Sequence, residues 1–513
     1  MSEQSEDAKV LQVAKTLKNA DGWKGFARRH ELGYYELQTE DTGGVPVRLF
    51  LTPTLLQETE DTLYRQIVNA TRFPGVRLVV ITPDTHYGYG VPVGCVLVTD
   101  ADAGAVAMGP VGYDIGCGMM SARSEVEAGA ATPEKRLEFN QAVMRRVDMG
   151  AGGKSRRLAG LSKSEFQNLV RGGAEYYVEK YGAKFDRSRA ERHRIPVEDS
   201  WQIPWGGKGR PERGQEQLGS LGGGNHFIEL QRSEQAGTLF LQVHTGSRGF
   251  GHGLATNYFE LAREEKPEQI TDIDLGYFTP SSEHYGDYLN AVAAGGNYAI
   301  LNRLVIFEGV SEAFREVFGA ELELVYEISH NLVQREQHPD YGDVWVHRKG
   351  ATRAFPAGHP ALEGTLWAET GHPVLIPGSN KDWSYILRPL VGAVNSGYSV
   401  NHGAGRKLSR GAAVRGLSQQ AIDDEYRAAG IVVNANGRVP LDEAAPAYKS
   451  SQEVIEAVTG AGLARIEHRL WPLASLKGTD ERGNKGRFKR SKGGNKGERG
   501  KRPGGPKKTS EHY

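Results

Sequence analysis

The stretch GTLFLQVHTGSRGFGHG, residues 237–253, joins an apolar run to a loop of glycine, histidine and arginine. Its first part, up to His244, is the kind of apolar run that forms a buried strand. Its second part places Ser247, Arg248 and His252 among glycines. Binding and catalytic residues are commonly carried on loops that a rigid sheet holds in place. The stretch therefore predicts a functional site at the end of a strand.

The same arrangement recurs along the chain. Further apolar runs that predict buried strands lie at 76–83, 322–330 and 372–379. Helical periodicity fits residues 132–147, 162–182 and 288–319. Nearly every cluster of His, Asp or Cys with glycine follows a predicted strand. These patterns predict an α+β fold, with a β-sheet core flanked by helices and a site on the loops at the strand ends.

Composition excludes several classes of protein. The chain has 513 residues, of which 38% are hydrophobic and 9% aromatic, values typical of a globular protein. No apolar run approaches the roughly 20 residues of a membrane-spanning helix. The polar N-terminal stretch lacks the apolar core of a signal peptide. Two cysteines, Cys95 and Cys117, cannot build a disulfide framework, and we expect a cytoplasmic protein without membrane partners.

Charge is distributed unevenly. The formal net charge is zero, but residues 479–513 carry twelve Lys/Arg against four Asp/Glu, so the rest of the chain is acidic. This Gly-, Lys- and Arg-rich tail cannot bury enough apolar surface to fold, and we expect it to be disordered. Its composition fits either a solubilising extension or a sequence-independent contact to nucleic-acid phosphates.

Five residues in the glycine-rich clusters form a candidate metal set. They are one carboxylate, one thiolate and three imidazoles: Asp114, Cys117, His226, His244 and His330. Taken alone, each histidine would more often be a hydrogen-bonded core residue, and Cys117 a small buried apolar one. A thiolate can bridge two ions, so the set predicts a pair of metals, for which Mn, Zn and Co are suitable by ligand type.

Basic residues accompany the same clusters. Arg248, Lys349, Arg406 and Arg410 are suited to phosphate, although each alone would more often be a surface charge. Together with the metal set they predict a polyanionic substrate. The stretch SVNHGAGRKLSR, residues 399–410, adds His402, which the residues alone leave open as a metal ligand, general base, nucleophile or packing residue. A phosphate-binding P-loop is excluded at 150–155, because Asp148 stands where the first glycine is required.

The clusters together resemble the RtcB family of RNA-splicing ligases. The resemblance rests on eight motifs in order: DIGCG, GSLGGGNHF, HTGSRGFGH, SHN, HRKGATRAFP, PGS, HGAGR and RLWPLASLKG. It extends from about residue 45 to 478 and implies an N-terminal segment 1–44, a single large catalytic domain 45–478 and the tail 479–513. Members of this family join RNA 3′-phosphate or 2′,3′-cyclic phosphate ends to 5′-hydroxyl ends.

The resemblance implies roles for individual residues. Asp114, Cys117 and His226 would hold one Mn²⁺, and Cys117, His244 and His330 a second. His402 would be the nucleophile that accepts GMP from GTP, with Asp84 at a matching position nearby. Arg248, Lys349, Arg406 and Arg410 would face phosphates or RNA. The nucleotide would be bound by Asn225, His226, Phe227, Glu229, His330, Asn331, Pro377, Gly378, Ser379, Ser384, His402, Gly403, Ala404, Gly405, Tyr448 and Lys477.

The sequence also departs from the usual family pattern. The loop PGSNKDWSY, residues 377–385, stands where the family usually has PGSMGT-x-SY, and Asn401 stands where it usually has cysteine. The implied partners are RNA, GTP and an archease-like activator, and the implied roles are RNA repair or tRNA splicing. The alternatives are an enzyme that caps RNA ends without sealing them, a two-metal phosphoesterase and a non-catalytic RNA-binding protein.

Overall fold

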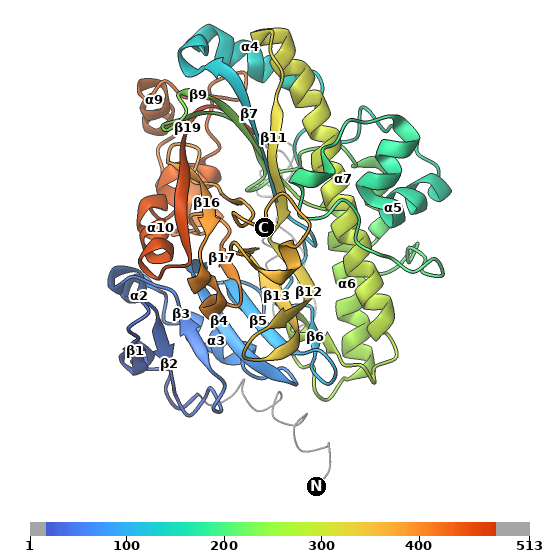
Figure 1. Cartoon of the computed structure of the whole chain (residues 1–513), viewed down its shortest axis with the longest axis vertical. Coiled ribbons are helices and arrows are strands. Elements are labelled where there is room, and N and C mark those ends of the chain that lie inside the picture. Colours follow the sequence, from blue (N-terminus) through green and yellow to red (C-terminus); the bar gives the residue numbers. More distant parts are fainter. Residues whose placement is uncertain (1–16, 479–513) are drawn as a thin grey trace, which may run out of the picture.

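The computed structural model describes residues 17–478 and contains two large β-sheets with helices packed around them (Figure 1). The predicted disorder of the tail, residues 479–513, lies outside the described residues. The α+β prediction is confirmed. None of the helices in residues 17–478 is both long enough and apolar enough to cross a membrane.

The first sheet has the strand order β1-β2-β3-β4-β5-β13-β12. Its strands are β1 (Ala27–Arg29), β2 (Tyr35–Leu37), β3 (Val47–Leu49), β4 (Val76–His86), β5 (Val93–Asp100), β13 (Gly342–Lys349) and β12 (Asn331–His338). All neighbours are antiparallel except β3 and β4. The N-terminal segment therefore shares a sheet with the domain that follows it.

Both faces of this sheet are buried, which explains its continuous apolar runs. Val79 and Ile81 of β4 belong to one core cluster, together with residues of α3 (Leu63–Ala70). Leu78 and Val80 belong to another, together with residues of α10 (Ser451–Gly460). Alternate residues of one strand thus enter different cores.

The second sheet has the order β11-β7-β9-β8-β19-β16-β15, with β18 (Val432–Val433) beside β19. Its strands are β11 (Glu323–Ser329), β7 (Gly118–Glu127), β9 (Thr238–Thr245), β8 (Phe227–Ser233), β19 (Ala464–Lys477), β16 (Ser384–Pro389) and β15 (Val374–Ile376). Along the main path every pair is antiparallel. Short pairs are formed by β14 (Ala351–Arg353) with β17 (Ser399–Asn401) and by β6 (Val106–Ala107) with β10 (Tyr277–Phe278).

Two of the helices cover one face of the second sheet. Apolar residues of α4 (Pro133–Met144) and α7 (Tyr285–Phe318) share a core cluster with β7, β8 and β9. The long α7 runs down one side of the molecule (Figure 1). The remaining α-helices of residues 17–478 are α2 (Pro53–Glu58), α5 (Lys163–Tyr181), α6 (Arg248–Glu265), α8 (Arg410–Gly416) and α9 (Gln419–Ala428).

Local sequence explains where these helices start and stop. Thr132 and Ser162 cap α4 and α5, because each hydroxyl accepts a hydrogen bond from a backbone N–H in the first turn. Gly182 and Gly319 end α5 and α7 in the left-handed conformation. The predicted helices at 132–147, 162–182 and 288–319 are confirmed as α4, α5 and α7, and the predicted strands as β4, β9, β11 and the short β15.

Antiparallel pairing brings strand starts and strand ends to one edge. In the second sheet, Gly118 is opposite both Ser329 and Thr245, and Phe227 is opposite Lys477. The prediction that the clusters follow strands is therefore only partly right. Cys117 and His226 directly precede β7 and β8, and they reach the site because these strands run opposite to β9 and β11.

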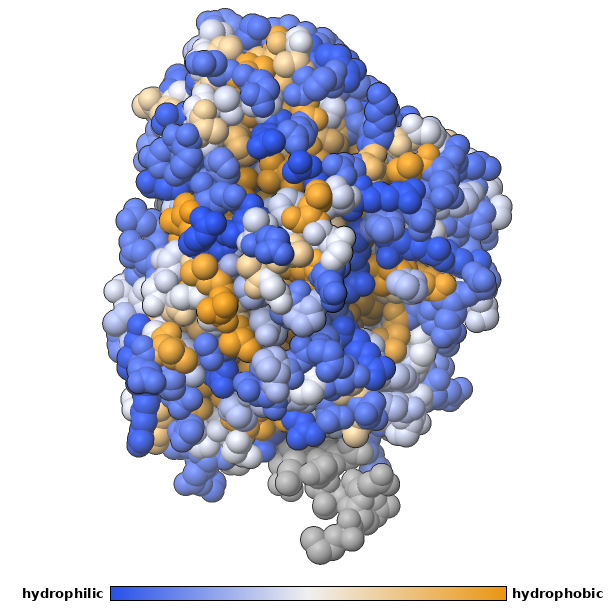
Figure 2. Space-filling model, in the orientation of Figure 1, coloured by the Kyte–Doolittle hydropathy of each residue, from blue (hydrophilic) through white to orange (hydrophobic). Residues whose placement is uncertain are grey.

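The two sheets meet at His330, which lies between β11 of the second sheet and β12 of the first. At the same edge of the first sheet, Asn331 is opposite Lys349, and Lys349 is opposite Cys95. Hydrophilic residues cover most of the face seen in Figure 2, with hydrophobic patches interspersed among them.

Candidate active site

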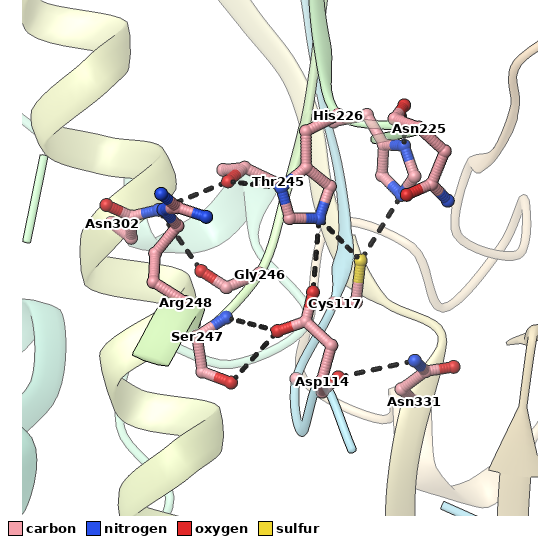
Figure 3. Close-up of polar contacts among 12 residues, drawn as sticks. Asp114, Cys117, Asn225, His226, Thr245, Gly246, Ser247, Arg248, Asn302 and Asn331 are labelled. Carbon is pink, nitrogen blue, oxygen red and sulfur yellow. Dashed lines mark hydrogen bonds and ion pairs between the residues drawn. The ribbon is translucent and has the colours of Figure 1, made fainter. Parts of the chain in front are cut away.

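Two groups of potential metal ligands share Cys117. The first is Cys117, His244 and His330, and the second is Asp114, Cys117 and His226; within each, the ligand atoms lie within 4.8 Å of one another. Cys117 Sγ lies 3.3 Å from His244 Nε2. It lies 3.6 Å from His226 Nε2 (Figure 3). The structure therefore brings the five predicted residues together around one sulfur.

Backbone carbonyls orient two of the imidazoles. His226 Nδ1 lies 3.0 Å from the Leu221 carbonyl oxygen, and His244 Nδ1 lies 3.1 Å from that of Asn225. With a metal bound, a proton on Nδ1 would satisfy these carbonyls and leave the Nε2 lone pairs free to bind the ion beside Cys117. Metal-binding histidines typically use their second nitrogen in this way.

The side chain of Asp114 lies next to the N-terminus of α6, which begins at Arg248. Its Oδ1 accepts hydrogen bonds from the backbone N–H of Ser247 at 2.8 Å and from the Ser247 hydroxyl at 3.1 Å, and its Oδ2 lies 3.1 Å from His226 Nε2 (Figure 3). Burial alone would raise the pKa of Asp114, but His226 and the N–H of Ser247 outweigh it and lower the pKa to about 2. Asp114 is thus a carboxylate at neutral pH, as a metal ligand must be.

The donor set fits a divalent cation. Burial lowers the pKa values of His244 and His330 well below the usual range, so both imidazoles are neutral. Burial and the Asp114 carboxylate raise the pKa of the Cys117 thiol well above its usual range. In these surroundings Cys117 can be a thiolate only when a cation is bound beside it, because a buried negative charge needs a positive partner.

His402 stands beside this centre, directly after β17. Its ring lies 4.9 Å from that of His330, measured between centroids, and its Nδ1 lies 2.6 Å from Asp84 Oδ2. The same carboxylate oxygen accepts the backbone N–H groups of His402 and Gly403 at 3.0 and 3.1 Å. Asp84 is fully buried, whereas the His402 side chain is 15% exposed. Asp84 therefore fixes one ring nitrogen and leaves Nε2 free to react.

Gly405 allows Asp84 to pack against this loop. Its φ is +77°, and a Cβ added there would lie 2.1 Å from the Asp84 carbonyl oxygen. At Gly403 an added Cβ would make only an ordinary contact, at 3.5 Å from the Pro377 carbonyl oxygen. The glycine at 405 is thus required by the protein's own packing.

A hydrogen-bonded chain through Gln231 links three of the residues predicted to bind the nucleotide: Glu229, Ser384 and Gly378. The Gln231 amide donates to Glu229 Oε1 at 2.7 Å and to the Ser384 hydroxyl at 3.1 Å, and Ser384 also accepts the Gly378 N–H at 3.0 Å. Burial raises the pKa of Glu229 to about 7, against the lowering effects of Gln231 and Lys477. Glu229 therefore changes its protonation state near neutral pH.

Glu443 forms ion pairs or hydrogen bonds with four of the other predicted residues. Its Oε1 lies 3.2 Å from Arg406 and 3.0 Å from Arg410, and its Oε2 accepts from the Tyr448 hydroxyl at 2.6 Å and from Lys477 Nζ at 3.0 Å. Burial would raise its pKa, but Lys477 and the two arginines lower it to about 2. A single buried carboxylate thus connects two of the basic residues, Arg406 and Arg410, to Tyr448 and Lys477 of the predicted nucleotide-binding set.

Comparison with known proteins decides the family. A family model described as "tRNA-splicing ligase RtcB" matches residues 66–478. The chain belongs to the RtcB family. It is 36% identical over 469 residues to the tRNA-splicing ligase RtcB of Pyrobaculum aerophilum, covering 85% of this chain and 95% of that protein. It is also 38% identical over 443 residues to the RNA-splicing ligase RtcB of Mycobacterium tuberculosis, covering 80% of this chain and all of that protein.

The basic residues of this RtcB chain differ in how many of their N–H groups are already hydrogen-bonded within the protein. Arg406 donates to Glu443, Tyr448, Asp442 and Leu408, so its guanidinium is occupied by the protein. Arg410 donates NH1 to Asp442 and Glu443, while its buried Nε has no hydrogen-bond partner among the described residues.

Lys349 and Arg248 are held by backbone carbonyls. Lys349 Nζ donates to the carbonyls of Tyr89 and Val91 at 2.6 and 3.0 Å, and burial lowers its pKa to about 8. Arg248 donates to the Gly150 carbonyl at 3.0 Å. Lys349 thus fixes the loop at residues 89–91 beside the site.

The remaining predicted residues surround the metal groups. Asn331 donates to the Asp114 carbonyl and accepts the Gly350 N–H, and Phe227 packs against His244 with Lys477 Nζ over its ring. Ser379 and Ala404 are buried, and Pro377 lies beside Gly403. Four residues of this region were not predicted from the sequence: Gln231, Asn302, Arg303 and Glu443. The signal for Asn302 and Arg303 was a polar pair inside the apolar run YAILNRLVIF, residues 298–307.

Proposed function

We propose that this chain, an RNA ligase by family, is a GTP- and Mn²⁺-dependent enzyme that joins RNA 3′-phosphate or 2′,3′-cyclic phosphate ends to 5′-hydroxyl ends. The observation that carries the proposal is the position of His402, with Nδ1 held 2.6 Å from a buried carboxylate and its ring against a residue of the metal groups. Its proposed roles are RNA repair or tRNA splicing, with RNA, GTP and an archease-like activator as partners.

His402 would act as the covalent nucleophile. Nε2 attacks the α-phosphorus of GTP, the bond to the β-phosphate oxygen breaks, and pyrophosphate leaves. Water first opens a 2′,3′-cyclic phosphate to a 3′-phosphate and a free 2′-hydroxyl. The RNA 3′-phosphate then takes GMP from the histidine, which restores the free imidazole. Finally the 5′-hydroxyl attacks the activated 3′-phosphate, and GMP leaves as the new phosphodiester forms. Asp84 supports the first step because its carboxylate stabilises the positive charge that develops on the imidazole.

The two groups around Cys117 would hold the two Mn²⁺ ions. When bound, these ions would neutralise charge that develops on phosphate oxygens. The neutral imidazoles, the ionised Asp114 and the shared sulfur support this assignment. Glu229 would accept hydrogen bonds from the guanine edge when ionised, and Arg410 would contact phosphate through its free donors.

The altered loop 380–383 is anchored to the structure around it. Tyr426 donates to Asn380, Lys381 pairs with Glu425 at 2.6 Å, and Asp382 accepts the Ser451 N–H at 2.9 Å. These contacts tie the loop after β15 to α9 and α10. They support a single fixed conformation of this loop beside the proposed nucleotide pocket.

The test is a ligation assay with oligonucleotides that end in 3′-phosphate, 2′,3′-cyclic phosphate or 3′-hydroxyl, each with a 5′-hydroxyl partner, GTP and Mn²⁺. We expect sealing of the first two substrates by the wild type, no sealing of the third, and none by His402→Ala. Phosphate release without GTP would indicate a phosphoesterase. Accumulation of a GMP-capped 3′ end would indicate end activation alone, and RNA binding without Mn²⁺ binding would indicate a retired ligase.

A further inference from the structure

Asn302 and Arg303 are fully buried polar residues in the middle of α7, and neither belongs to the metal or nucleotide sets. A buried charge in an apolar helix is costly unless it is fully paired. The loop that carries Cys117 approaches the helix closely at this level, because a Cβ on Gly116 would lie 2.8 Å from Ala299 and 2.9 Å from Gly296 Cα. Small residues on α7 thus let the helix reach the site.

Arg303 contacts the neighbours of three metal-group residues. Its NH1 donates to the carbonyl oxygens of Gly116 and Thr245 at 2.8 and 2.9 Å, and its NH2 donates to the Ser329 hydroxyl at 2.9 Å. These three residues directly adjoin Cys117, His244 and His330 in the sequence. The Nε of Arg303 donates to Glu327 at 2.6 Å, which supplies the counter-charge.

Asn302 contacts the loops that support the other group. Its side-chain amide donates to the Ser220 carbonyl at 3.2 Å. It also donates to the Gly246 carbonyl at 3.1 Å and to the Thr245 hydroxyl at 3.2 Å (Figure 3). The Thr245 hydroxyl donates to the Leu221 carbonyl, which also faces His226 Nδ1. Gly246 precedes Ser247, which donates to Asp114.

We propose that these consecutive residues of α7 are positioning residues: Asn302 serves one metal group, and Arg303 serves the other together with the shared Cys117. Arg303 orients Cys117, His244 and His330, and Asn302 orients His226 and Asp114. The inference rests on the proposed two-metal site. Outer contacts that orient metal ligands typically contribute about 10- to 100-fold to metal affinity. A lysine at 303 would keep the charge, but its single ammonium cannot replace a planar guanidinium that reaches three acceptors and Glu327.

The experiment is a titration of the metal-stripped full chain with Co²⁺, without GTP or RNA. Calorimetry gives the affinity of each step, and the thiolate-to-cobalt absorption band reports the surroundings of Cys117. The reference variants His330→Ala and His226→Ala identify which step belongs to which group. We expect Arg303→Lys to weaken the His330 step about 10- to 100-fold, to weaken the His226 step less, through the shared Cys117, and to shift the absorption band. We expect Asn302→Ala to weaken the His226 step by a similar factor.

The matched control is Arg348→Lys. Arg348 is also a buried arginine paired with a glutamate, Glu336, at 2.6 Å, but none of its partners adjoins a metal-group residue. It should lower thermal stability and leave both Co²⁺ steps and the spectrum unchanged. Wild-type titration curves and spectra in folded Arg303→Lys and Asn302→Ala would overturn the proposal, as would weakening of the same single step by both.

If Arg303→Lys fails to fold, the titration of Asn302→Ala alone tests the proposal. Loss confined to the His226 step supports the proposal, and an unchanged titration contradicts it. If the wild type itself binds no metal, the proposed function fails instead, so the two failures are distinguishable.

Discussion

Replacing Asp84 by asparagine tests how the carboxylate prepares His402. Three groups converge on Asp84 Oδ2: His402 Nδ1, in ion-pair contact at 2.6 Å, and the backbone N–H groups of His402 and Gly403. The other oxygen accepts from the Thr82 hydroxyl at 2.6 Å, and that hydroxyl can accept instead. The amide introduced by Asp84→Asn should therefore keep its oxygen towards His402 and turn its nitrogen towards Thr82.

The expected effect follows from this orientation. The Nδ1–H tautomer is preserved, and what is lost is the negative charge. A hydrogen bond to a charged group contributes about 1.5–3 kcal/mol and a neutral one about 0.5–1.5 kcal/mol. The difference of about 1–1.5 kcal/mol corresponds to a rate of self-guanylylation about 5- to 15-fold lower. Asp84→Ala should lose far more, at least about 100-fold, because the ring and two buried N–H groups lose their acceptor.

The assay is the initial rate of acid-labile protein labelling with α-labelled GTP at saturating Mn²⁺, with the metal content measured in parallel. A loss near 10⁴-fold in Asp84→Asn would mean that the amide nitrogen faces the imidazole and imposes the wrong tautomer. A wild-type rate in Asp84→Ala would refute the positioning role altogether.

Four further predictions concern other parts of the site. Cys117→Ser should abolish both steps of metal binding, because the sulfur belongs to both metal groups, whereas His330→Ala should abolish only one. Metal analysis of the two variants measures this, and equal losses of metal would contradict the shared sulfur. The KM for GTP should fall as pH rises through about 7, because Glu229 must be ionised to accept from guanine, and Glu229→Gln should remove this dependence. Glu443→Gln should lower the free energy of unfolding by about 3 kcal/mol in denaturant titration, since its buried cations lose their counter-charge; no change would argue against the network. Deleting residues 479–513 should weaken RNA binding and flatten its salt dependence while self-guanylylation persists.

Much of the site was predictable because its residues carry distinctive chemistry. A thiolate, a carboxylate and three imidazoles beside glycines predict a metal centre, and the structure gathers all five around Cys117. The direction of the strands was not predictable from the apolar runs. Antiparallel order brings residues that precede strands, such as His226, to the same edge as residues that follow them, such as His330.

The supporting residues were harder to predict. Arg303 lies inside an apolar helical run, and two of its partners are backbone carbonyls, which have no signature in the sequence. Glu443 resembles any surface glutamate until folding surrounds it with Arg406, Arg410 and Lys477. Arg406 illustrates the converse, since an arginine that was predicted to face phosphate directs its donors to the protein.

The most direct test of the central claim is to isolate the protein after incubation with α-labelled GTP and Mn²⁺ and to map the labelled peptide by mass spectrometry. We predict one GMP per chain on His402, acid-labile and dependent on Mn²⁺, discharged by RNA with a 3′-phosphate, and absent in His402→Ala. A label that persists in His402→Ala, or its absence from a wild type with both metal groups filled, would contradict the account.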